Sequence, residues 1–214
     1  QGLRGAHRGA EGGAGMVKVL VASRNPGKVR ELDQVLRELN IDGVELVSLD
    51  DAPAYPDPVE DGLTFEENAV LKARAGAEAT GLPCVADDSG LAVTALNGMP
   101  GILSARWSGT HGDDAANNQL LLNQMADIND RRAAFVSCCA LATPAGGIYT
   151  AEGRWEGELL REPRGEGGFG YDPLFAPGDA PGRSSAELSP EEKNARSHRG
   201  KALRELAQHI AALQ

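Results

Sequence analysis

VKVLVASRNPGKVRELDQVLREL, residues 17–39, predicts a strand, a short turn and a helix in direct succession. Its first six residues are mostly β-branched or apolar without polar alternation, which is typical of a strand buried on both faces. After the turn SRNPGK, apolar residues recur at the 3.6-residue period of a helix. Those residues are Val29, Leu32, Val35, Leu36 and Leu39. We therefore expect a buried strand followed by a helix with one apolar face.

The next segments continue this alternation. A second strand is predicted over VELVSL (44–49), followed by a Pro- and Asp-rich loop (50–62) that is too long and polar for a simple connection. A capping-box pattern at Thr64 opens a helix that runs to about Thr80, where Gly81 ends it. Loops as long as the one over 50–62 often carry function.

The middle of the chain predicts extended structure around one helix. CVADDSGLAVTAL (84–96) predicts a strand, an acidic turn and a second strand, and Asn97-Gly98 is a turn signal. Helical periodicity returns over 113–126. Two extended segments, 133–143 and 147–159, flank the turn PAGG and predict a hairpin.

The C-terminal part ends in a helix with an apolar side. A second capping box, with proline at the first helical position, occupies residues 189–192. The apolar side of the closing helix consists of Leu203, Leu206, Ile210 and Leu213. Because no internal repeat is visible and strands and helices are mixed throughout, we expect an α/β or α+β architecture.

Composition and charge exclude several classes of protein. The 214 residues carry 21 basic and 31 acidic side chains, a net charge of −10, and 4% aromatic residues, which argues against a general nucleic-acid or anionic-membrane binder. No apolar run approaches the roughly 18 residues of a membrane span. Three cysteines without metal-ligand spacing indicate core residues in a reducing compartment: Cys84, Cys138 and Cys139. We expect residues 1–15 to be a disordered or cloning-derived extension and 16–214 to form one folded domain.

The turn SRNPGK (23–28) is a candidate anion site. It places backbone N–H groups and Lys28 at a helix N-terminus, which suits a polyphosphate. The alternative is an ordinary strand-to-helix turn with a solvated lysine. A Walker A loop is excluded, because it would need Gly at Ala22 and Ser or Thr at Val29.

The acidic motif Asp87-Asp88-Ser89-Gly90 is a candidate cation site. Adjacent carboxylates disfavour each other's ionisation unless a cation neutralises them. Hard oxygen ligands suit Mg²⁺, and a carboxylate beside an activated water is its general base. The alternative is a turn with aspartate caps. Glu60, Glu66 and Glu67 are further candidate ligands or bases.

Two C-terminal motifs complete the candidate site. GEGGFGYDP (165–173) has G-x-G-x-x-G spacing, but a dinucleotide fingerprint must open a helix, and the residues after it start none. Phe169 and Tyr171 would form a planar slot for a nucleobase, or else belong to a plain Gly-rich loop. Lys193 can share a cleft with the motif SHRG (197–200) only if the helix breaks near its serine.

Taken together, these motifs resemble those of the inosine triphosphate pyrophosphatases, also called dITP/XTP pyrophosphatases, in their bacterial branch. The resemblance runs from about Val17 to the C-terminus through SRNPGKVREL, EDGLTFEENAVLKA, ADDSGLAV, GILSARWSG, GGFGYDPLF and EEKNARSHRGKAL. It implies a homodimer of α/β subunits, each with a mixed, curved central sheet, flanking helices and two lobes around a deep cleft.

The resemblance also implies a cytoplasmic enzyme without nucleic-acid or membrane partners. Such an enzyme uses Mg²⁺ to hydrolyse ITP, dITP and XTP to the nucleoside monophosphate and pyrophosphate. It cleanses the nucleotide pool and keeps these nucleotides out of DNA and RNA.

Residue by residue, the resemblance implies a set of site positions. Asp88 resembles the catalytic proton acceptor that also touches the metal, Glu60 resembles the second metal ligand, and Asp87 matches a supporting position. The implied substrate-binding residues are Ser23, Arg24, Asn25, Pro26, Gly27, Lys28, Lys72, Ser89, Phe169, Gly170, Tyr171, Asp172, Lys193, His198 and Arg199. Many members have Thr-Gly or Thr-Asn where this chain has Ser23-Arg24, so Arg24 either changes phosphate affinity or points to solvent.

These residues suggest a mechanism and leave two alternatives open. We expect lysines to offset the phosphate charge while water activated by Asp88 attacks the α-phosphorus. Donors aimed at O6 would accept a 6-keto purine and reject adenine. One alternative is a pyrophosphatase for modified pyrimidine triphosphates or dUTP. The other is a nucleotide sensor without hydrolysis, against which the Asp87-Asp88 pair argues.

Overall fold

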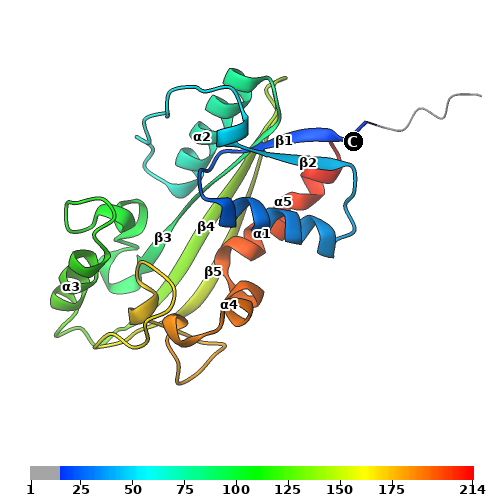
Figure 1. The fold of residues 1–214 in the computed structure, drawn as a ribbon. Coiled ribbons are helices and arrows are strands. Elements are labelled where there is room, and N and C mark those ends of the chain that lie inside the picture. The colour runs from blue at the N-terminus through cyan, green and yellow to red at the C-terminus, as the bar shows by residue number, and fades with distance from the viewer. Residues whose placement is uncertain (1–14) are drawn as a thin grey trace, which may run out of the picture.

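A single six-stranded mixed sheet organises the computed structural model, which describes residues 15–214 (Figure 1). The strand order is β2-β1-β3-β4-β5-β6, parallel among the first three strands and antiparallel among the last four. The strands are β1 (Val17–Val21), β2 (Val44–Ser48), β3 (Cys84–Val93), β4 (Arg132–Ala142), β5 (Ile148–Leu159) and β6 (Phe175–Pro177). This confirms the predicted mixed α/β fold.

Residues 15–214 contain five α-helices. They are α1 (Pro26–Glu38), α2 (Phe65–Thr80), α3 (Asp114–Gln124), α4 (Pro190–Arg196) and α5 (His198–Ala211). Of these, α1 and α5 cover one face of the sheet and α2 covers the other. Residues alternate between the faces of a strand, so each face has its own core. On one face α1 and α5 pack with Val19, Val21 and Val85, and on the other α2 packs with Leu20 and Cys84. Figure 1 shows α3 at the far end of the long strands from β1 and β2, which gives the molecule two lobes.

The first strand, turn and helix form as predicted, with one difference at the helix end. Asn25 caps α1 by accepting a hydrogen bond from the Gly27 N–H, and Pro26 occupies the first helical position. Leu32, Val35 and Leu36 are buried. Leu39 lies beyond the last helical residue and is 43% exposed, so its assignment to the apolar face was wrong.

The acidic motif lies within a strand, contrary to the sequence prediction of a turn between two strands. β3 runs unbroken for 10 residues and pairs with β4 along its whole length. The sequence predicts a turn at Asp87 and Asp88 because carboxylates favour turns. Within β3 they are instead compensated by cations from other elements, as described below. The turn at Asn97-Gly98 does form, with both residues at positive φ.

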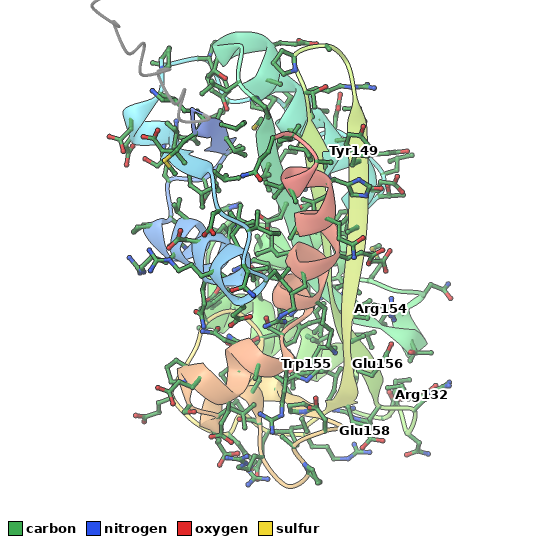
Figure 2. All side chains as sticks on the ribbon, turned by 90° about the vertical axis from the view of Figure 1, so that its right-hand side faces the viewer. Arg132, Tyr149, Arg154, Trp155, Glu156 and Glu158 are labelled. Carbon is green, nitrogen blue, oxygen red and sulfur yellow. The ribbon has the colours of Figure 1, made fainter. Side chains whose placement is uncertain are left out.

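The remaining elements match the sequence predictions closely. β4 and β5 form the expected hairpin, and Thr64 caps α2 while Gly81 ends it in a left-handed conformation. The C-terminal helical region breaks at Ser197, whose extended backbone separates α4 from α5. Figure 2 shows β5 beside α5, with Arg154 and Glu156 on the exposed side of the strand, while Trp155 between them is buried.

The remaining predictions concern the two ends of the chain and the absence of a membrane-spanning segment. The extension predicted over residues 1–15 lies, apart from Gly15, outside the described residues. Among residues 15–214, every helix is too short or too polar to cross a bilayer. Leu213 follows the last helical residue of α5 and is only partly buried against the core.

Candidate active site

The candidate site lies where β1 stops and β3 continues. β1 pairs with β3 only through Leu20 and Val21, and beyond Val85 this side of β3 pairs with no other long strand among the described residues. β1 and β3 are parallel, so the site lies past the carboxyl end of β1, where ligands commonly bind to parallel sheets. Asp87 and Asp88 occupy this free stretch of β3 and point to opposite faces.

Asp87 faces α1 and α5, where it is surrounded by cations. The Lys28 Nζ lies 2.9 and 3.1 Å from the two carboxylate oxygens, and the Arg199 Nε lies 3.4 Å from one of them. Arg199 also contacts Glu31 at 3.2 Å. Burial alone would raise the pKa of Asp87, but Lys28 and Arg199 overcome it and lower that pKa below its ordinary value. Asp87 is therefore an ionised anchor for two cations.

Asp88 faces α2 and has a different environment. Asn68 Nδ2 donates to its Oδ2 at 3.2 Å, and the Lys72 Nζ lies 3.9 Å from its Oδ1. Burial raises the pKa of Asp88, although Lys72 and the Asn68 hydrogen bond oppose this shift. The repulsion expected between the adjacent carboxylates is present, since Asp87 is one of the charges that raise the pKa of Asp88. As expected, cations offset it, and each carboxylate meets its own cations on its own face.

Glu60 comes to the Asp88 side from the loop over 50–62. The Lys72 Nζ lies 3.0 Å from Glu60 Oε1 and also contacts Asp88, so both carboxylates converge on one cationic group. Residues 15–214 contain no group of three or more His, Cys, Asp or Glu side chains that could hold a metal ion by themselves. Mg²⁺ is commonly held by one or two carboxylates, with water and substrate phosphates as its other ligands. Glu60 and Asp88 fit that kind of site. Glu66 and Glu67 lie elsewhere: Glu66 contacts Thr150, and Glu67 accepts from the Leu63 N–H.

The turn over 23–28 is ordered by its own hydrogen bonds. Ser23 Oγ accepts from the Asn25 N–H at 3.0 Å, and Pro26 and Gly27 form the first turn of α1. Arg24 points to a neighbouring hollow of about 240 Å³ and pairs with Asp57 of the 50–62 loop at 3.2 Å. Glu60 and Lys72 line the same hollow, so Arg24 joins the turn to the loop that carries Glu60.

A cavity of about 180 Å³ lies next to this cluster, with a lining that includes residues of β3, α3, α4 and α5. Phe169 on its border is 68% exposed, and the Lys193 Nζ lies 4.6 Å above its ring. His198 stacks on Phe135 with ring centroids 5.2 Å apart. The residues that line the cavity are Ser89, Gly90, Leu91, Ser104, Ala105, Asp114, Asn117, Phe135, Phe169, Gly170, Tyr171, Asp172, Lys193, His198 and Arg199. The break at Ser197 brings the residues of α4 and α5 to this cavity together.

Several of these side chains already have protein partners. Asp172 is buried and accepts from the Phe169 N–H, Ser185 Oγ and Lys193 Nζ, so its carboxylate orders the segment 169–172. Ser89 Oγ lies 2.9 Å from Ser137 Oγ. Burial and the nearby Arg199 and Lys193 lower the pKa of His198 to about 3, which keeps its imidazole neutral above that pH.

Some residues of the site were not predicted as such. Glu31 holds Arg199, Asn68 holds Asp88, and Asp114 and Asn118 contact the backbone of Gly170. Glu31 follows Lys28 by three residues, so both face the same side of α1 and the helical period was a usable signal. Asp114 and Asn118 carry no such signal, because their partner lies more than fifty residues away in the chain.

Comparison with known proteins gives consistent results over nearly the whole chain. A model of the Ham1 family matches residues 19–209. The chain is 60% identical to a Nocardia farcinica protein named dITP/XTP pyrophosphatase over 200 residues, covering 92% of this chain and 97% of the relative. It is also similar to the crystal structure of a nucleoside-triphosphatase / dITP/XTP pyrophosphatase from Mycobacterium abscessus, with 58% identity, a TM-score of 0.76, and coverage of 92% and 100%. A HAM1 protein from Coxiella burnetii is 42% identical with a TM-score of 0.84 and the same coverage.

Proposed function

Because the chain belongs to the Ham1 family and is a nucleoside triphosphate pyrophosphatase, we propose a substrate class for it. We propose that its substrates are the non-standard purine nucleotides ITP, dITP and XTP. The predicted family is thereby confirmed. The products would be the nucleoside monophosphate and pyrophosphate. In a cell this reaction would remove these nucleotides from the cytoplasmic pool before they enter DNA or RNA.

One observation carries this proposal. A cavity with an exposed aromatic ring and neutral His198 adjoins a cluster in which Lys28 and Lys72 meet two carboxylates. The cavity suits a planar base, because an aromatic face and a polar tip are what stacking with some hydrogen bonding requires. The lysines suit a polyphosphate, whose charge must be offset for phosphoryl transfer. The two parts are contiguous, since Ser89 and Arg199 line the cavity beside Asp87.

The chemical roles follow from the environments of the two aspartates. Asp87 is held ionised and positions Lys28 and Arg199, so it is poorly suited to accept a proton. Asp88 has a raised pKa and is the better general base, because a base works best when its pKa lies nearer the working pH. Water that gives its proton to Asp88 would attack the α-phosphorus, and pyrophosphate would leave.

Mg²⁺ is the cofactor we propose, with Glu60 and Asp88 as the residues that would hold it. When bound, it would neutralise triphosphate oxygens and polarise the reacting phosphorus. Lys72, which now contacts both carboxylates, would be free to shift its hydrogen bonds toward phosphate oxygens.

Selectivity for a 6-keto purine would come from donors around the base. Lys193 and Arg199 both line the cavity, and neither can accept a hydrogen bond. The O6 of hypoxanthine or xanthine would accept from such a donor, whereas the amino group of adenine would leave it unpaired. An unpaired buried donor costs about 1–3 kcal/mol, which is enough for about tenfold to hundredfold discrimination.

The test is product release from a panel of nucleotides, with Mg²⁺ and with chelator. We expect metal-dependent release of pyrophosphate and monophosphate from ITP, dITP and XTP, with ATP and GTP much slower. Preference for dUTP would keep the chemistry and overturn the substrate. Binding of the whole panel without turnover would support a nucleotide sensor instead.

One substitution tests the role proposed for Asp88. Asp88→Asn should abolish turnover while nucleotide binding persists, because the amide keeps the shape but accepts no proton. Turnover comparable to the wild type would refute the assignment. Sedimentation of the wild-type protein would test the proposed homodimer.

A further inference from the structure

Two side chains of α3 grip the backbone of Gly170. Asp114 Oδ2 accepts from the Gly170 N–H at 2.9 Å, and Asn118 Nδ2 donates to the Gly170 carbonyl at 3.0 Å. Asp114 and Asn118 are four residues apart and therefore share one face of α3. One helical turn thus satisfies both polar backbone groups of a single residue in the segment 169–172.

These two hydrogen bonds act on a residue that has no side chain of its own to pack. A Cβ added to Gly170 would meet no atom within 4 Å, so its surroundings leave space. Its φ of +59° lies in the left-handed region that favours glycine, and glycine has more backbone freedom to lose than other residues. The two α3 side chains restrict this freedom.

The orientation of the Asn118 amide is determined by this contact. Its Oδ1 is buried and has no hydrogen-bond partner among residues 15–214. Exchanging the nitrogen and the oxygen would place Oδ1 against the Gly170 carbonyl, acceptor against acceptor. Asn118 thus keeps its hydrogen bond to Gly170 while its buried Oδ1 stays unpaired. Leaving a buried acceptor unpaired is unfavourable.

Gly170 connects two residues that line the proposed purine cavity. Phe169 precedes it, and the ring of Phe169 is exposed at the border of the cavity. Tyr171 follows it, and the Tyr171 hydroxyl donates to the Ser104 carbonyl at 2.7 Å. The segment is thus attached to α3 and to Ser104, and Lys193 contacts Asp172, the residue that follows Tyr171.

We propose that Asp114 and Asn118 are positioning residues that hold the segment 169–171 in the geometry that binds the purine. This inference rests on the proposed function. It means that the affinity for the base depends on the contact with α3, whereas the affinity for the triphosphate depends on other residues. Asn118 does not line the cavity, so its effect on purine binding would pass through Gly170 alone, whereas Asp114 also lines the cavity.

The test compares two ligands that share only part of the substrate. Inosine monophosphate carries the base, and inorganic tripolyphosphate carries the charge without a base. In calorimetry, Asp114→Ala and Asn118→Asp should weaken binding of inosine monophosphate by about five- to tenfold, the worth of roughly one hydrogen bond, and leave tripolyphosphate affinity unchanged. Asp114→Asn, which keeps an acceptor oxygen, should restore most of the affinity.

The control variant is Asp113→Ala. Asp113 caps α3 by accepting from the Ala116 N–H at 3.1 Å. Its side chain has no hydrogen bond to Gly170, so Asp113→Ala weakens the start of the helix but removes neither of the two hydrogen bonds to Gly170. It should bind inosine monophosphate as the wild type does. A readout independent of function is hydrogen exchange of the Gly170 amide, which should accelerate in Asp114→Ala and not in Asp113→Ala.

The outcomes separate this inference from the proposed function. Equal affinity for inosine monophosphate in the wild type and both variants would refute the positioning role, and so would an equal loss in Asp113→Ala. Loss of affinity for both ligands alike would also refute it. If the wild type itself does not bind inosine monophosphate, the proposed function fails first and the role in purine binding fails with it.

Discussion

Replacing Asp87 by Asn should destabilise the protein through the cations it leaves behind. The change keeps the shape of the side chain and removes its charge, so Lys28 loses its carboxylate partner and Arg199 retains only Glu31. Breaking a buried ion pair by removing one partner costs about 3–5 kcal/mol. The side chains of Lys28 and Asp87 are 26% and 13% exposed, so we expect the lower end, about 3 kcal/mol. For a chain of this size that lowers the Tm by roughly 6–12 °C.

The assay is urea unfolding of a double-mutant cycle with Lys28→Gln. The double variant should be about 2 kcal/mol more stable than the sum of the two single effects predicts. The reason is that it contains neither the carboxylate nor the ammonium group, so no unpaired charge remains at position 28. Asp33→Asn is the matched control on α1: Asp33 pairs with Arg37 on the surface, and its loss should cost less than about 0.5 kcal/mol. A coupling energy within about 0.5 kcal/mol of zero would refute the reasoning.

The pH dependence of this effect has a defined sign. The pKa of Asp87 is lower in the folded protein than its ordinary value, so the folded state holds the proton less tightly than the unfolded state does. The stabilisation is therefore fully present above the unfolded pKa of about 3.9 and is lost as the pH falls below it toward the folded pKa. The difference between the wild type and Asp87→Asn should be constant from about pH 7 to about pH 5 and should shrink only in stronger acid. A difference that shrinks already at neutral pH would contradict the assigned ionisation.

Three further predictions concern other parts of the molecule. Because the pKa of His198 is about 3, His198→Asn should raise KM without changing how the rate depends on pH between neutral and mildly acidic pH. A pH dependence that is present in the wild type and lost in the variant would show that the imidazole titrates in this range. Gly153→Ala should destabilise the protein by about 1–3 kcal/mol and raise KM, since its Cβ would meet the backbone carbonyl of His198 and push the start of α5 away, and thermal unfolding with steady-state kinetics measures both. Burial raises the pKa of the Cys84 and Cys138 thiols to about 12, so a thiol reagent should label no cysteine in the native protein and all three in denaturant; rapid native labelling would contradict their burial.

The parts of the fold that were predicted correctly depend on signals local in sequence. The cap at Thr64, the left-handed Gly81 and the proline after Ser189 each act within one helical turn, so the sequence alone locates those helix boundaries. The acidic motif was mispredicted because its stabilising partners are not local: Lys28 and Arg199 approach from helices far away in the chain. A pair of carboxylates in a strand is unfavourable until those cations are in place.

The candidate site divides in the same way. The motif residues around Lys28, Asp88 and His198 were located from sequence, and in the structure Lys28 pairs with Asp87, Lys72 lies near Asp88, and His198 lines the neighbouring cavity. The grip of Asp114 on Gly170 could not be predicted, because it depends on how the lobe that contains α3 meets the segment after β5. Sequence motifs therefore indicated the residues proposed to contact the substrate better than the residues that hold them in place.

The unbroken course of β3 explains why two adjacent aspartates can serve different purposes. Successive residues of a strand point to opposite faces, so Asp87 meets the cations of α1 and α5 while Asp88 meets the amide and lysine of α2. Had the motif formed a turn, both carboxylates would have shared one solvent-exposed environment and similar pKa values. The strand instead lowers one pKa and raises the other within a single dipeptide. Because β1 ends before this point, Asp87 and Asp88 lie next to each other on a stretch of β3 that β1 leaves unpaired, so the proposed ionised anchor and the proposed general base are adjacent residues with opposite pKa shifts.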